Sequence, residues 1–125
     1  MLSLYGTQSG LDCETIVKIG AAFGSGMGMG ETCGAVTGAL MVIGLGKPTT
    51  KKLGVLSREK TADIAHEFVE QFKTRNGTAL CRELLGCNVS TPEGLKAAKK
   101  EKHFKKRCPK FVADAAEILD ELAGD

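Results

Sequence analysis

The chain has 125 residues, of which 42% are hydrophobic and 26% charged, and its formal net charge is +2. This length suits one domain with an aliphatic core, and the composition excludes a disordered chain. We therefore expect a single compact domain over residues 1–125.

The first half of the chain predicts helices interrupted by glycine. Residues 1–5 have the pattern of the last turn of an apolar helix that begins abruptly, so we expect a short native N-terminal segment to be missing. Asp12 is expected to cap the next helix through the amide of Thr15. The apolar stripe of that helix comprises Ile16, Val17, Ile19 and Phe23. Gly24 to Gly30 then form a glycine-rich loop.

The second half predicts four more segments, and none has the alternating pattern of a strand. Residues 31–45 could be a buried strand by composition, but their length and the spacing of Gly34 and Gly38 favour a buried helix. Three more helices are expected after it. The first is capped by Ser57 and ended by Gly77, the second is a short helix from Thr78 to Gly86, and the last has Pro109 at its first position. The expected fold class is all-α, a single bundle of five or six helices.

Alternating glycines dominate the loop and continue into the helix after it. They are Gly26, Gly28, Gly30, Gly34 and Gly38. A dinucleotide-binding fingerprint would need a preceding strand and a βαβ unit, which this sequence does not predict. Instead, glycines permit positive φ and close backbone approach, and they deliver Cys33 to the start of a helix, where free amides favour a thiolate. A buried, inert cysteine is the alternative.

Two other functional classes are not favoured. The longest apolar run, residues 35–45, is about half of the roughly 20 residues that a membrane span needs. Residues 96–110 hold eight Lys or Arg against Glu101 alone. This basic segment carries no nucleic-acid-binding motif, so we expect it to be a solvated face.

The cysteines are the strongest chemical signal. There are five, an odd number, and no signal peptide precedes them, so we expect a cytoplasmic protein with redox or metal chemistry. Cys81 is followed by Arg82. Cys108 follows three basic residues and would cap the last helix. The positive neighbours of Cys81 and Cys108, and the helix start at Cys108, are expected to favour the thiolate, as is the helix start at Cys33.

The segments "GMGMGETCGAVTGALMVIGL", "CRELLGC" and "CPKFVADAAEILDEL" resemble the redox-active family named for the motif C_GCAxxG_C_C. The resemblance spans nearly the whole chain and implies a helical fold and redox activity. It matches Cys33, Cys81 and Cys108 to three of the family's cysteines. The family's first cysteine lies upstream of the residues present here, and Cys87 is extra.

Three hypotheses follow. In the first, Cys33, Cys81 and Cys108 converge and act by thiol–disulfide chemistry, with Cys33 as the nucleophile, Cys81 or Cys108 resolving, and an unidentified redox partner. In the second, the same cysteines bind a metal such as zinc or an iron–sulfur cluster. In the third, the protein is a helical interaction module with inert cysteines. The sequence leaves open whether the chain forms a homodimer through the face of Gly34 and Gly38.

Overall fold

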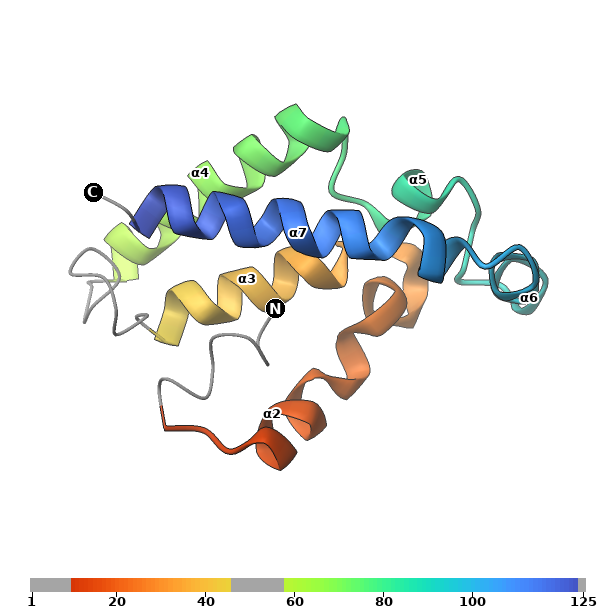
Figure 1. Ribbon diagram of the computed structural model, residues 1–125, viewed down its shortest axis with the longest axis horizontal. Helices are drawn as coiled ribbons and strands as arrows, with labels where there is room; N and C mark the ends of the chain where they lie inside the picture. The colour runs from red at the N-terminus through yellow and green to blue at the C-terminus, as the bar shows by residue number, and fades with distance from the viewer. Residues whose placement is uncertain (1–9, 46–57, 124–125) are drawn as a thin grey trace.

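The computed structural model describes residues 10–45 and 58–123. Within these ranges the chain forms six α-helices and no strand, which confirms the predicted all-α class (Figure 1). The helices are α2 (Cys13–Gly20), α3 (Gly34–Leu45), α4 (Arg58–Asn76), α5 (Cys81–Leu85), α6 (Pro92–Lys100) and α7 (His103–Ala123). No helix of this part of the chain is long and apolar enough to cross a membrane.

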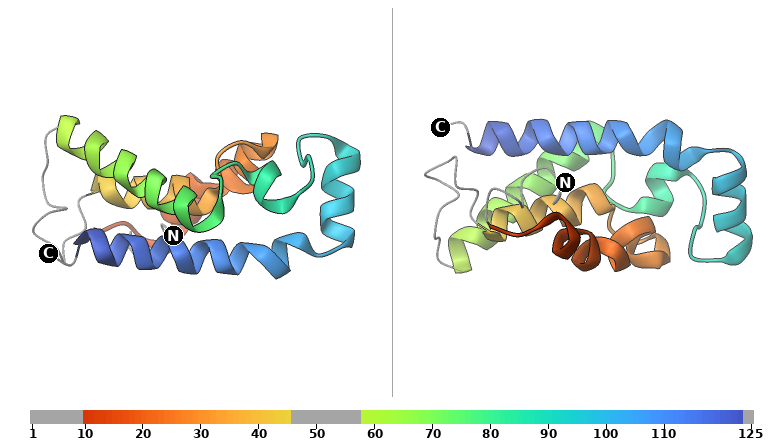
Figure 2. Two further views of the ribbon diagram at one scale, coloured as in Figure 1. Left: turned by 90° about the horizontal axis from the view of Figure 1, so that it is seen from above. Right: turned by 60° about the horizontal axis from the view of Figure 1, so that its bottom comes forward.

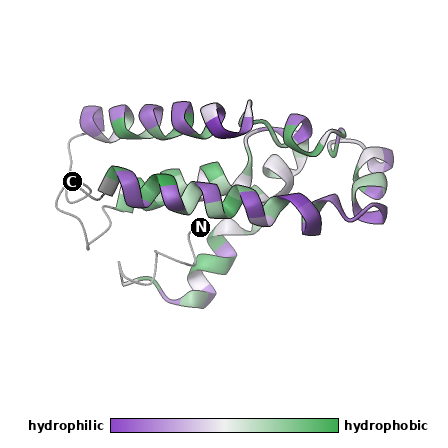
Figure 3. Ribbon diagram, turned by 45° about the horizontal axis from the view of Figure 1, so that its top comes forward, coloured by the Kyte–Doolittle hydropathy of each residue, from purple (hydrophilic) through white to green (hydrophobic). Residues whose placement is uncertain are grey.

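The core lies between α3, α4 and α7, which pack on one another. Figure 3 shows why: α3 is mostly hydrophobic, whereas α4 and α7 change between hydrophilic and hydrophobic faces along their turns. Phe68 and Phe72 of α4 are fully buried, as are Ile118 and Leu119 of α7. Burying each such side chain contributes about 1.5–3 kcal/mol, so these contacts hold the three helices together.

Shorter elements surround one end of this core. The helix α6 lies across the start of α7, and α5 lies between α6 and α3 (Figure 2). A short turn, Ala21–Phe23, and the segment Gly26–Gly30 join α2 to α3. The N-terminal and C-terminal halves of the chain therefore meet at this end of the bundle.

Asp12 caps α2 as predicted, because its Oδ1 accepts a hydrogen bond of 2.6 Å from the amide of Thr15. The expected apolar stripe on this helix is wrong in part. Ile16 is buried, but Val17 and Ile19 are 66% and 46% exposed. The helix ends at Gly20, after eight residues, so it is too short to bury a continuous stripe against α3.

The ends of α4 and α5 also follow the sequence. Gly77, with φ of 82°, ends α4, and Gly86, with φ of 72°, ends α5. The expected Ser57 cap lies outside the described residues. Thr78 does not begin a helix; its hydroxyl donates to Glu83 over 2.6 Å and accepts from the amide of Leu80, and α5 begins only at Cys81.

The prediction for the last helix is wrong at its start. Pro109 is not the first residue of α7 but lies inside it, because the helix begins at His103. Lys102 adopts a left-handed conformation, φ of 58°, and ends the connection from α6. Strong helix formers at residues 105–107 then continue the helix into Pro109. The ring of Pro109 is exposed, and the residue has no backbone N–H to donate within the helix. Cys108 consequently lies within α7 rather than at its cap.

Candidate functional site

The glycine segment before Cys33 is a left-handed turn. Positive φ occurs at Ser25, Gly26, Met27, Gly28 and Gly30. The amide of Glu31 donates to the carbonyl of Gly26 over 3.1 Å and closes the turn. A Cβ at Gly26 would lie 2.4 Å from the Glu31 nitrogen, so only glycine fits. The turn thereby places residues 31–33 beside another segment of the chain.

That segment is the stretch just before α5. Thr32 and Leu80 form an isolated antiparallel bridge. On either side of it, the amide of Cys33 donates to Ala79 over 2.7 Å, and the amide of Cys81 donates to Glu31 over 2.6 Å. Cys33 and Cys81 are therefore diagonal neighbours across one bridge, an arrangement that separates Cα atoms by about 7–8 Å.

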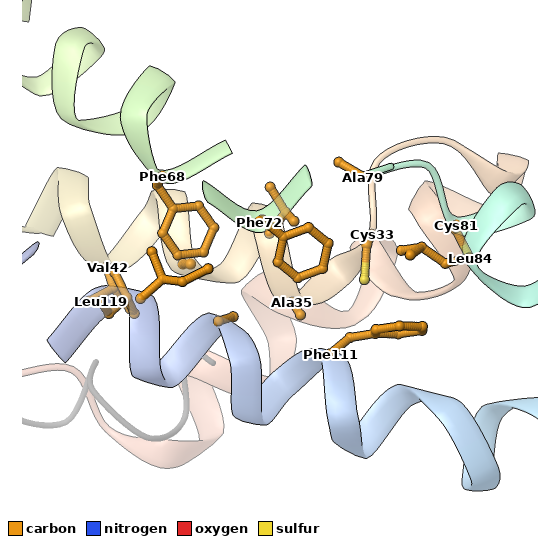
Figure 4. Packing of buried hydrophobic residues seen from close by; sticks show 14 of the residues in the cluster. Cys33, Ala35, Val42, Phe68, Phe72, Ala79, Cys81, Leu84, Phe111 and Leu119 are labelled. Carbon is orange, nitrogen blue, oxygen red and sulfur yellow. The ribbon is translucent and has the colours of Figure 1, made fainter. Parts of the chain in front are cut away.

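Cys33 occupies the position just before α3 and is 8% exposed. Its carbonyl accepts hydrogen bonds from the amides of Val36 and Thr37, which begin the helix. In Figure 4 its sulfur points toward α7 and Phe111. Burial raises the pKa of the thiol, and hydrogen bonds from the amides of Ala35 and Val36 oppose that effect only in part.

Cys81 is 7% exposed, at the first residue of α5. Its pKa is raised to about 11, first by burial and then by the charges of Cys33, Cys108 and Cys87. Interactions between charges weaken with distance. The three predicted site cysteines, which come from three separate segments of the chain, therefore lie near enough to one another for Cys33 and Cys108 to affect the pKa of Cys81.

Cys108 completes this group from α7. It is half-buried, and its pKa is raised by burial and then by Cys33. Sequence position suggested thiolate stabilisation at all three cysteines, and this expectation is wrong for each. Burial outweighs every favourable interaction, because removing a thiolate from water costs more than two amide hydrogen bonds recover.

The neighbouring arginines do not reverse this effect, because both guanidinium groups are engaged elsewhere. Arg82 forms a 3.1 Å ion pair with Glu31 and contacts the carbonyl of Gly30. Arg107 donates to the carbonyl of Leu84 over 3.2 Å. Adjacency in sequence therefore does not bring positive charge to the sulfurs.

A metal centre needs its ligands at bonding distance from one point. Among residues 10–45 and 58–123, no group of three or more His, Cys, Asp or Glu has the arrangement to hold a metal ion. All five cysteines lie in these ranges as free thiols. In this conformation the described cysteines therefore form no group of three or more that could hold a metal ion.

The remaining predicted glycines differ in their surroundings. A Cβ at Gly34 would meet the carbonyl of Phe23 at an ordinary 3.6 Å, and one at Gly28 would meet nothing within 4 Å. Gly34 and Gly38 line an open cavity of about 350 Å³ between α2 and α3, together with Ile16 and Met41. This face of α3 is therefore turned toward α2.

Sequence reasoning missed one member of the cysteine group. Cys87 had no assigned role, yet it is half-buried and is among the thiols that raise the pKa of Cys81. Its position directly after the helix-ending Gly86 was the available signal. Cys13, by contrast, is exposed at the start of α2 and is not among those thiols.

Comparison with known proteins agrees with the cysteine pattern. Residues 1–122 match a family model described as "Putative redox-active protein (C_GCAxxG_C_C)". No curated protein and no solved structure gives a significant match to the chain.

Proposed function

The chain belongs to the C_GCAxxG_C_C family of redox-active proteins, and from this premise we propose that Cys33, Cys81 and Cys108 carry out thiol–disulfide exchange with a cytoplasmic partner. The observation that supports this function is the convergence of the three thiols. Cys81 interacts electrostatically with both Cys33 and Cys108, and Cys108 with Cys33. Each thiol therefore has a neighbour that can accept or resolve a disulfide.

Cys33 is the proposed nucleophile, because it alone of the three has backbone amide hydrogen bonds among the causes that lower its pKa. Its thiolate attacks one sulfur of the partner disulfide, forms a mixed disulfide and releases one partner thiolate, which takes up a proton. Cys81 or Cys108 then loses its proton and attacks the Cys33 sulfur. The internal disulfide forms, and the second partner sulfur leaves as a thiol. The protein is oxidised by two electrons and the partner is reduced by two.

Burial of the three thiols slows this exchange. Because the pKa of each thiol is raised, all three are protonated near neutral pH, and little thiolate is available to attack. The diagonal placement of Cys33 and Cys81, about 7–8 Å between Cα atoms, also lies beyond the Cα separation of about 4.4–6.8 Å that a disulfide requires. Exchange therefore requires movement at the bridge that holds these two residues.

The test measures exchange directly. Reduced native protein is incubated anaerobically with glutathione disulfide, and the released glutathione and remaining protein thiols are counted. We expect two glutathione molecules per internal disulfide formed. Cys33→Ser should lower the total release, because no disulfide to Cys33 can form, whereas Cys13→Ser, which changes an exposed thiol on α2, should leave it unchanged.

The same preparation tests the rival chemistry. Iron, zinc and acid-labile sulfide are measured in protein purified without oxygen. Stoichiometric metal that is lost in Cys33→Ser, Cys81→Ser and Cys108→Ser, with no internal disulfide in any sample, would contradict the proposed function.

A further inference from the structure

The end of α5 brings a fourth cysteine toward the site. Gly86 follows the helix in the left-handed conformation, with φ of 72° and ψ of 17°. At helix ends of this kind, a contact frequently joins the residue after the left-handed glycine to a residue about five or six positions earlier in the chain. The residue after Gly86 is Cys87, and the residue six positions before Cys87 is Cys81.

The surroundings of Cys87 agree with that placement. Cys87 packs against the edge of the hydrophobic core that contains Cys33 and Cys81. Its thiol contacts the carbonyl of Gly94 at 3.8 Å, and Gly94 itself lies so close to Asn88 that a Cβ would clash with the Asn88 carbonyl. The connection from α5 to α6 therefore holds Cys87 in one place rather than leaving it on a free loop.

Exposure distinguishes Cys87 from its neighbour. Cys81 is 7% exposed and Cys33 is 8% exposed, whereas Cys87 is only partly covered. Cys87 also adds to the charge repulsion that disfavours a Cys81 thiolate. The thiols that interact with Cys81 are thus one buried thiol, Cys33, and two half-buried thiols, Cys87 and Cys108.

We propose that Cys87 is a further redox thiol, which exchanges disulfides with Cys81 and connects the buried thiols to solvent. The proposal rests on the proposed function, because it concerns how oxidising equivalents enter and leave that site. A low-molecular-weight disulfide reacts first with Cys87, which forms a mixed disulfide and releases one external thiol. Cys81 then resolves the mixed disulfide, so that a Cys81–Cys87 bond forms and the second external thiol leaves.

The disulfide then moves from Cys81–Cys87 to Cys33–Cys81 by an internal rearrangement that needs no external oxidant. The Cys33 thiolate attacks the Cys81 sulfur of the Cys81–Cys87 disulfide. The Cys33–Cys81 bond forms, the Cys81–Cys87 bond breaks, and the Cys87 sulfur takes up the proton that Cys33 gave up. The same steps in reverse move the disulfide from Cys33–Cys81 back to Cys81–Cys87.

The experiment follows each cysteine over time. Reduced native protein is mixed with glutathione disulfide, samples are quenched with acid, and peptides are mapped by mass spectrometry. We expect glutathione on Cys87 and a Cys81–Cys87 link before any link to Cys33. In both Cys87→Ser and Cys87→Ala, oxidation of Cys33 should slow about tenfold or more, whereas Cys13→Ser should match the unchanged protein. Circular dichroism confirms that each variant keeps its helices.

The outcomes separate this inference from the proposed function. If both Cys87 variants are folded and oxidise Cys33 at the unchanged rate, Cys87 is not the route and the inference is overturned, while the proposed function stands. If the Cys81–Cys87 link forms but Cys33 enters no disulfide in any sample, exchange between Cys81 and Cys87 is supported and the role of Cys33 is refuted.

Discussion

Cys33 and Cys81 flank one antiparallel bridge, in which the amide of each donates to the residue opposite it on the other segment. The segments that carry these cysteines are nearly fifty residues apart in sequence. Two backbone hydrogen bonds, of 2.7 and 2.6 Å, fix their relative position. The proposed site consequently depends on the short segments 31–33 and 79–81 more than on any single helix.

Gly26→Ala tests how the glycine turn positions Cys33. The new Cβ at position 26 would lie 2.4 Å from the nitrogen of Glu31, and the residue would also have to adopt a positive φ. In Gly28→Ala the new Cβ has no neighbour within 4 Å, so the positive φ is the only cost. We expect Gly28→Ala to lower the free energy of unfolding by about 1–2 kcal/mol, and Gly26→Ala by about 3 kcal/mol or more. Chemical denaturation measures both. Equal losses in the two variants would show that the contact with Glu31 has no role.

The raised pKa of Cys81 predicts a loss of stability in alkali. Its ordinary value is 9.0 and its value in the fold is about 11, so the folded state holds the proton more tightly than the unfolded state. The stabilisation is complete below pH 9.0 and is lost as the pH rises toward 11. We expect the free energy of unfolding to fall over this range, and less steeply in Cys81→Ala. Parallel curves for the two proteins would contradict the assignment.

The thiols should also titrate as a coupled group. Burial is the first cause of the raised pKa of Cys81, and the charge of Cys33 is the second. We therefore expect Cys33→Ser to lower the pKa of Cys81, as measured by the pH dependence of its alkylation in the native protein. Cys13→Ser is the matched control and should not shift it. The alkylation rate of Cys81 should rise about tenfold per pH unit below its pKa.

Pro109 provides a test of the helix that carries Cys108. A proline inside a helix leaves the carbonyl four residues earlier, here that of Lys105, without its N–H partner. We expect Pro109→Ala to raise the stability by about 1–3 kcal/mol, seen as a higher thermal midpoint. If Pro109 were instead the first residue of the helix, as the sequence suggested, the same change would leave the midpoint nearly unchanged.

Much of the fold could be predicted from local patterns. Asp12, Gly77 and Gly86 end or begin helices through their own backbone preferences, which the sequence displays directly. The start of α7 could not be predicted, because proline suits a first helical position better than an interior one, and the strong helix formers at residues 105–107 overrode that preference.

The electrostatics of the proposed site could not be predicted from the sequence. Their positions near expected helix starts, their basic neighbours and the family resemblance selected Cys33, Cys81 and Cys108, and in the fold these thiols interact electrostatically. Their pKa values depend on burial and on where Arg82 and Arg107 point, which only the folded chain determines. The proximity of Cys87 likewise follows from the turn at Gly86 rather than from any standard cysteine spacing.

The central claim is that Cys33 shares one redox-active group with Cys81 and Cys108. Its most direct test is to equilibrate the reduced native protein with glutathione disulfide, block free thiols in acid, and identify disulfide-linked peptides by mass spectrometry. We predict a peptide in which Cys33 is linked to Cys81 or Cys108. Recovery of all three as blocked free thiols at equilibrium would contradict it.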